Sequence, residues 1–272
     1  YSVGFHFWRW ARVDLKILQA ISDRLYHAKK DGKPIEPITT EYPAITFSDA
    51  YKIQSLNLDR EIKLGFKVVG RKIGLTGKAM QSMFGVYEPD YGAILDNMVF
   101  NDGDTLKVNQ FILPKVEAEV AFVFKNDLAG PGITPVKVLQ ATDFIFPILE
   151  LIDSRIKDWK IKIYDTIADN ASASGVVIGG IKRKIDHLDL KYIPLIFKRN
   201  GQIFDTGVGA NVMGNPVHSV TWLANKLAEY GSSIKAGEIV LSGAITKAVS
   251  VNQNDWVTGD FGDFGEISIG FN

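Results

Sequence analysis

Three glutamates are the residues of this chain best suited to chemistry. Glu117 and Glu119 are separated by a single alanine within residues 115–124, and Glu150 lies in the apolar run 144–152. A β-strand directs residues i and i+2 to one face, so a strand here would present Glu117 and Glu119 together. Carboxylates without cysteine or an obvious histidine partner suit Mg²⁺ or Mn²⁺ better than zinc or copper. The pattern therefore indicates a site for a hard divalent cation.

Each part of this pattern has an ordinary alternative. A strand with Glu-x-Glu often has one solvated polar edge, but Ala121 and Val123 continue the glutamate face as apolar residues. The run around Glu150 is typical of a strand buried on both faces, where an acid must be protonated, paired or bound to a metal. Arg155 is the candidate salt-bridge partner for Glu150. Because buried carboxylates are costly without a compensating cation, we favour the metal site.

Lys72 is the candidate catalytic cation. Apolar residues flank it, together with Gly70 and Gly74, which allow a ligand or backbone to approach closely. A lysine desolvated near a metal could act as an acid or base, or hold an enolate oxygen. The spacing of a phosphate-binding P-loop is absent.

Three polar segments read as ordinary structure from their residues alone. Residues 88–92, which include Asp90, read as a turn, and residues 169–174 as a polar loop or helix start. Ser242-Gly243 follows an apolar strand. The four histidines form no set, and no Gly-x-Ser-x-Gly elbow predicts a hydrolase triad.

Composition is that of an ordinary globular protein of 272 residues, with 46% hydrophobic and 23% charged residues. Lysine plus arginine and aspartate plus glutamate number 31 each, which argues against a nucleic-acid binder. The absence of cysteine excludes disulfides and a cysteine nucleophile. No apolar stretch predicts a membrane span, and the aromatic, basic residues 1–12 do not form a secretory signal.

Hydrophobic periodicity predicts an α+β protein in three parts. These are an N-terminal extension over residues 1–12, a helical cap over 13–66 and a β-rich catalytic domain over 67–272. Helices are expected at 14–31, 46–65, 135–142 and 216–230. Strands are expected at 66–73, 92–95, 116–124, 145–152, 176–178, 195–199, 239–241 and 267–271.

Five motifs, in this order, resemble a known family. They are Gly70-Arg-Lys-Ile-Gly-Leu-Thr, Glu88-Pro-Asp-Tyr-Gly, Glu117-Ala-Glu, Glu150-Leu-Ile-Asp-Ser-Arg and Ala168-Asp-Asn-Ala-Ser. The chain resembles the 2-oxopent-4-enoate (2-hydroxypenta-2,4-dienoate) hydratases of the fumarylacetoacetate hydrolase superfamily. The similarity extends from about residue 15 to the end.

The resemblance implies a mixed β-roll or sandwich with outer helices. It also implies Mg²⁺ or Mn²⁺ on Glu117, Glu119 and Glu150, with Lys72 and Asp90 in catalysis. Two serines, Ser174 and Ser242, would bind substrate oxygens. The implied reaction is hydration of 2-hydroxypenta-2,4-dienoate to 4-hydroxy-2-oxopentanoate in the meta-cleavage of aromatic compounds. The implied protein is a cytoplasmic homo-oligomer, able to associate with a sister decarboxylase or a downstream aldolase, and uses no nucleic acid or membrane.

Alternatives within and outside the family stay open. Arg71 beside Lys72, Asp90 and residues 158–166 favour a hydratase over a 4-oxalocrotonate decarboxylase, whereas residues 243–249 look more like the decarboxylases. Gly77 stands where a serine is common. A hydratase for a longer 2-oxo-diacid is a further alternative, and so is a catalytically idle partner subunit.

Overall fold

The computed structural model describes residues 13–272, so the predicted extension over residues 1–12 lies outside the described residues. Three helices open the described chain: α1 (Leu15–Asp31), α2 (Ile38–Glu41) and α3 (Phe47–Lys63). Helix α1 begins where the Asp14 carboxylate accepts a hydrogen bond from the Lys16 N–H, and it ends where Gly32 adopts a left-handed φ of 62°. These helices confirm the expectations for residues 14–31 and 46–65.

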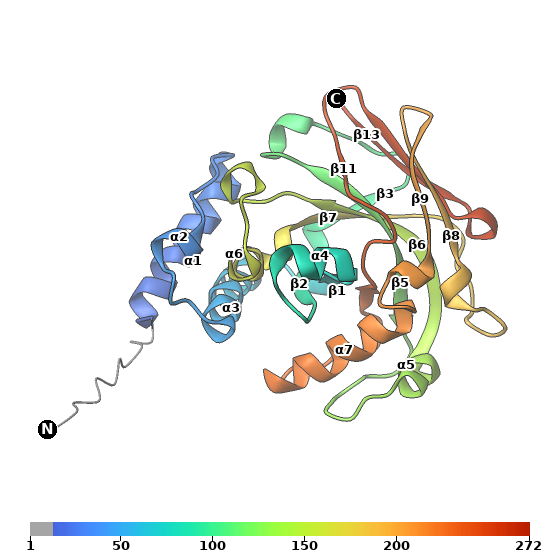
Figure 1. The fold of residues 1–272 in the computed structure, drawn as a ribbon, viewed down its shortest axis with the longest axis horizontal. Helices are drawn as coiled ribbons and strands as arrows, with labels where there is room; N and C mark the ends of the chain where they lie inside the picture. Colours follow the sequence, from blue (N-terminus) through green and yellow to red (C-terminus); the bar gives the residue numbers. More distant parts are fainter. Residues whose placement is uncertain (1–12) are drawn as a thin grey trace, which may run out of the picture.

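Two sheets form the main body of the structure (Figure 1). The eight-stranded sheet has the order β2-β1-β10-β5-β6-β7-β3, and β11 also pairs with β5. Its strands are β1 (Val68–Gly74), β2 (Asp90–Leu95), β3 (Val99–Asn101), β5 (Lys115–Phe124), β6 (Thr142–Ile152), β7 (Ala173–Ile178), β10 (Ile239–Leu241) and β11 (Val249–Ser250). The five-stranded sheet has the order β4-β13-β12-β8-β9. Its strands are β4 (Thr105–Leu106), β8 (Pro194–Arg199), β9 (Gln202–Val208), β12 (Trp256–Asp260) and β13 (Glu266–Phe271).

Four further α-helices lie between strands of the described chain: α4 (Lys78–Phe84), α5 (Pro135–Ala141), α6 (Ile163–Ala168) and α7 (Pro216–Glu229). Helix α6 lies beside the N-terminal helices, and α5 and α7 pack against each other (Figure 1). None of the helices over residues 13–272 is long and apolar enough to cross a membrane.

The main core lies on the face of β5 opposite the glutamates. Val116, Ala118, Val120, Phe122 and Phe124 are all buried in the main hydrophobic cluster, which also contains residues of the five-stranded sheet. The alternation along β5 thus sends apolar residues into one core and leaves the carboxylates on the other face. The mixed, two-sheet architecture with outer helices confirms the predicted α+β class.

Several elements were not predicted. Strand β9 is an edge strand whose residues are mostly exposed, so it carries no alternation of apolar and polar residues to detect. Strand β12 and the short helices α4 and α6 were missed as well. The division into a cap and a catalytic domain at residues 66 and 67 remains a prediction.

Candidate metal centre and its surroundings

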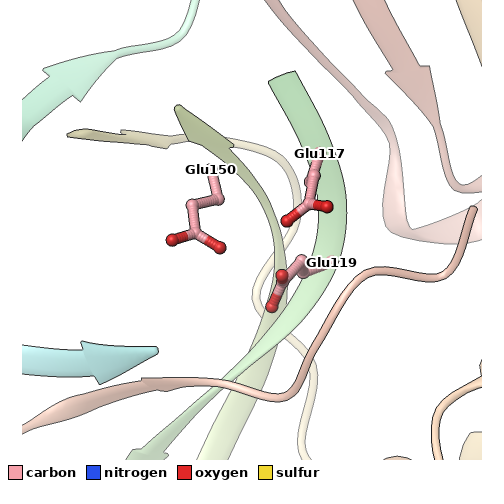
Figure 2. A group of neighbouring side chains, drawn as sticks. All are labelled: Glu117, Glu119 and Glu150. Atoms are coloured by element: carbon pink, nitrogen blue, oxygen red, sulfur yellow. The ribbon is translucent and has the colours of Figure 1, made fainter. Parts of the chain in front are cut away.

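The three glutamates converge because two antiparallel strands pair in the right register. Glu117 on β5 lies directly opposite Glu150 on β6, and Glu119 follows two residues later on the same face. One carboxylate oxygen from each residue lies within 4.8 Å of the others. Figure 2 shows the three carboxylates directed into a common space on one side of the two strands. The three predicted glutamates therefore lie close enough together to form one cluster.

The electrostatics of the cluster call for a cation. Glu119 and Glu150 are fully buried, and the Gly243 N–H donates to Glu119 Oε2 at 2.7 Å. Glu119 Oε1 and both oxygens of Glu150 have no hydrogen-bond partner within the described part of the chain. Burial raises the pKa of Glu119 well above its usual range, and it raises the pKa of Glu150 to about 8 although Lys72 acts in the opposite direction. Unsatisfied buried carboxylates with raised pKa values are the environment in which a divalent cation replaces protons.

Lys72 on β1 completes the cluster. Its side chain is buried, with Nζ at 3.3 Å from Glu150 Oε1. The ammonium donates a hydrogen bond to the Ala171 carbonyl oxygen at 3.1 Å. Burial acts to lower the pKa of Lys72, but the carboxylates of Glu150 and then Asp90 outweigh it and the pKa is raised. Lys72 is thus held as a cation beside the glutamates.

Arg155 is not the partner of Glu150, so the alternative of a salt bridge between them is wrong. Its Nε pairs with Asp169 Oδ1, and its backbone N–H donates to Asp169 Oδ2 at 2.9 Å. Strand β6 ends at Ile152, so Arg155 lies beyond the strand that carries Glu150. Asp169 itself is buried, and the segment predicted as a polar loop or helix start forms a 3-10 turn over Asn170–Ser172 that leads into β7.

Asp90 lies beside Lys72 rather than in a turn. It is the first residue of β2 and pairs across to Gly74, while Lys72 pairs with Gly92. Its Oδ2 accepts a hydrogen bond from Thr166 Oγ1 at 3.2 Å, and its buried Oδ1 has no partner in the described chain. Burial raises the pKa of Asp90. A Cβ at Gly74 would lie 2.2 Å from Asp90 Oδ1 and 3.3 Å from Lys72 Nζ, so only glycine leaves room for both groups.

The two predicted serines differ in burial. Ser242 is fully buried after β10, and its hydroxyl lacks a partner within residues 13–272, as a substrate-binding group would. Ser174 is half-buried on β7. Ser172, not among the predicted residues, is buried with an unpartnered hydroxyl in the turn that supplies the Ala171 carbonyl to Lys72. The Asp-Asn-Ala-Ser motif contained this residue, but only the structure shows its burial.

Comparisons with known proteins place the chain in a family. No protein-family model matches it. It is 44% identical over 257 residues to a 2-oxo-hept-4-ene-1,7-dioate hydratase of Escherichia coli, covering 92% of this chain and 96% of that protein. It is 45% identical over 231 residues to a 2-keto-4-pentenoate hydratase of Paraburkholderia xenovorans (strain LB400), covering 85% and 86%. A 4-oxalocrotonate decarboxylase of Pseudomonas sp. (strain CF600) is 40% identical, with 88% and 90% covered.

Solved structures agree with these relatives. A 4-oxalocrotonate decarboxylase from Pseudomonas putida G7, complexed with magnesium and adipate, superimposes with a TM-score of 0.93 at 35% identity, covering 96% of this chain and 99% of that one. A fumarylpyruvate hydrolase from Pseudomonas aeruginosa, at a TM-score of 0.59, 13% identity and coverage of 74% and 88%, shares the fold.

The described chain has the fold of a fumarylacetoacetate hydrolase and carries a buried carboxylate cluster suited to a divalent metal. The chain belongs to the family of the 2-keto-4-pentenoate (2-oxopent-4-enoate) hydratases, which are hydro-lyases.

Proposed function

We propose that this chain hydrates 2-hydroxypenta-2,4-dienoate to 4-hydroxy-2-oxopentanoate with Mg²⁺ or Mn²⁺ as cofactor, in the catabolism of aromatic compounds by meta-cleavage. The observation that carries the proposal is the set of buried carboxylate oxygens on Glu119 and Glu150 that lack hydrogen-bond partners, although Lys72 lies 3.3 Å from one of them. Relatives named as hydratases at 44–45% identity support the reaction.

Glu117, Glu119 and Glu150 would hold the cation. Their oxygens are close enough to share one ion, and carboxylates are the ligands that magnesium and manganese prefer. When bound, such an ion supplies Lewis acidity toward the oxygens of a 2-oxo acid.

The chain's own groups would manage the protons. Lys72, held as an ammonium, would hydrogen-bond the enolate oxygen that forms as the dienol ketonises. Asp90, with a raised pKa and a free buried oxygen, would give and take the proton that moves along the conjugated carbon chain. Ser242 and Ser174 would hydrogen-bond substrate oxygens. The net reaction adds one water across the conjugated system and needs no oxidant or reductant.

A 4-oxalocrotonate decarboxylase is the second candidate, and the superposition with the Pseudomonas putida G7 enzyme favours it. Arg71 does not decide between the two, although its presence predicts a hydratase. It precedes Lys72 on β1, so its side chain takes the opposite face, where it lies 3.5 Å from Glu238. We therefore do not propose Arg71 as a substrate contact.

Assembly and location form a further part of the proposal. We infer a cytoplasmic homo-oligomer that is able to associate with a sister decarboxylase or a downstream aldolase, as catabolic relatives suggest. Half-buried apolar residues border the smaller hydrophobic cluster on the glutamate face, including Val123, Phe144 and Ile239, and they provide surface for such contacts. Light scattering on the purified chain would report the subunit number.

The deciding experiment follows the ultraviolet absorbance of 2-hydroxypenta-2,4-dienoate with chelated enzyme, before and after addition of Mg²⁺ or Mn²⁺. We expect metal-dependent loss of the diene with 4-hydroxy-2-oxopentanoate as product. Release of carbon dioxide from 2-oxo-3-hexenedioate, without turnover of the dienoate, would instead identify the decarboxylase.

A further inference from the structure

The turn that holds Lys72 has an unusual backbone. Asn170, Ala171 and Ser172 have φ values of 53°, 50° and 57°, so three consecutive non-glycine residues are left-handed. Residues with a Cβ rarely adopt this conformation singly, and asparagine tolerates it best. The turn therefore needs contacts that hold it in place.

One side chain supplies two of these contacts. The Asn170 amide donates from Nδ2 to the Ala93 carbonyl at 2.9 Å and accepts at Oδ1 from the Ala93 N–H at 2.8 Å. Gly92 permits the approach, because a Cβ there would lie 2.3 Å from the Asn170 carbonyl oxygen. Asn170 thus joins the turn to strand β2.

This connection links the two proposed proton-handling groups. Asp90 lies at the start of β2, three residues before Ala93, and the Ala171 carbonyl of the turn accepts the hydrogen bond from Lys72 Nζ. Hence the Asn170 amide fixes the strand that carries the acid to the carbonyl that orients the lysine.

We propose that Asn170 is a positioning residue, which aligns Lys72 with Asp90 and with the cation site through the Ala171 carbonyl. The inference depends on the proposed function, because it assigns Asn170 an effect on the chemical step that Lys72 serves. Asn170 lies outside the metal-binding strands, so metal binding is expected to be independent of it.

The test is Asn170→Asp, which removes the donor to the Ala93 carbonyl while keeping the size of the side chain. We expect kcat to fall about 10- to 100-fold, as a small misplacement of a catalytic group produces, with KM and Mn²⁺ affinity changed less than about threefold. Asn170→Gly, which accepts the left-handed backbone without the amide, is expected to behave alike. If the Asn170→Asp variant fails to fold, Asn170→Gly is compared with the wild type in its place.

Asn225 offers a matched control. Its amide makes the same pair of hydrogen bonds, both at 2.9 Å, to the N–H and carbonyl of Ile133. Asn225→Asp loses an equivalent donor on α7, and its hydrogen bonds involve none of the proposed site residues. We expect an unchanged kcat for this variant.

A double-mutant cycle with Lys72→Met distinguishes an effect of Asn170 on the position of Lys72 from a general loss of order in the site. If Asn170 acts through Lys72, adding Asn170→Asp to Lys72→Met lowers the residual rate by less than about twofold. Full additivity of the two effects, or a kcat for Asn170→Asp equal to that of Asn225→Asp, would overturn the positioning role. Wild-type enzyme inactive on the dienoate would instead refute the proposed function, so the two failures are distinguishable.

Discussion

Replacing Glu119 by glutamine is expected to stabilise the metal-free protein while abolishing its activity. Glu119 is fully buried, and its carboxylate lies within 4.8 Å of those of Glu117 and Glu150. At an effective dielectric constant of about 20, two unit charges 4.8 Å apart repel by about 3.5 kcal/mol, so full ionisation would cost about 7 kcal/mol for the two pairs that include Glu119. Protons shared among acids with raised pKa values reduce this repulsion. We therefore expect a gain of about 1–3 kcal/mol in the free energy of unfolding.

The glutamine retains the contact that Glu119 makes with the backbone. Its carbonyl oxygen can still accept the hydrogen bond from the Gly243 N–H, so the local structure is expected to persist. What is lost is a negative ligand, and with it most of the stabilisation that Mg²⁺ confers on the folded state. Thermal unfolding with chelator and with Mg²⁺ measures both effects, at roughly 2–4 °C for each kcal/mol.

Glu238→Gln provides the matched control. This carboxylate is also largely buried, but it lies 3.5 Å from Arg71 on the opposite face of β1. Removing its charge leaves Arg71 unpaired, so this variant is expected to lose stability and to keep its response to Mg²⁺. Two results would refute the reasoning about the cluster. One is a Glu119→Gln variant that is less stable than the wild type in the presence of chelator. The other is a variant that gains as much stability from Mg²⁺ as the wild type does.

Three further predictions follow from the same geometry. Lys72→Met is expected to lower kcat by about 10²–10⁴-fold while binding Mn²⁺ no more weakly than the wild type, since an ammonium is removed from the cation's surroundings; unchanged turnover would remove the lysine from the mechanism. Metal affinity, measured by calorimetry, is expected to rise with pH until about pH 8, because the pKa of Glu150 is raised from 4.5 to about 8 and protons compete with the ion. The same shift makes the chelated protein less stable as the pH rises from 4.5 to about 8. Affinity and stability that do not change with pH would contradict both expectations. Gly243→Ala is expected to cost about 1–3 kcal/mol of stability and to weaken metal binding, because its φ is 111° and a Cβ would lie 2.3 Å from Thr76 Oγ1; an unaffected melting temperature would show that the turn can adjust.

Local pattern predicted much of the fold and part of the site. The period of two along β5 placed Glu117 and Glu119 on one face, because the other face is continuously apolar and buried. The pairing of Glu117 with Glu150 depends on strand register, which the sequence alone does not provide. The apolar run around Glu150 and the motif resemblance both indicated this residue, but neither gave its register against Glu117.

Tertiary contacts explain what the sequence could not provide. Arg155 is near Glu150 in the chain, yet its guanidinium forms a salt bridge with Asp169, which lies at the end of α6. The left-handed backbone at residues 170–172 contains no glycine, so the residue types there do not predict it. Ser172 and Asn170 acquire their significance only from that turn.

The charges of the site argue for a substrate with a single carboxylate. The three glutamates bring three negative charges, Lys72 brings one positive charge, and the raised pKa of Asp90 favours its neutral form. A divalent cation makes this group neutral, so a dienoate monoanion adds only one charge to a buried space. A diacid would add a second and would need a cation of its own. Lys115 lies on the same face of β5, but its ammonium is 4.2 Å from the centre of the Trp159 ring. It would have to leave this cation–π contact to bind a second carboxylate of the substrate. A lower KM for the dienoate than for a seven-carbon diacid is therefore expected, and the reverse order would refute this argument from the net charge of the cluster.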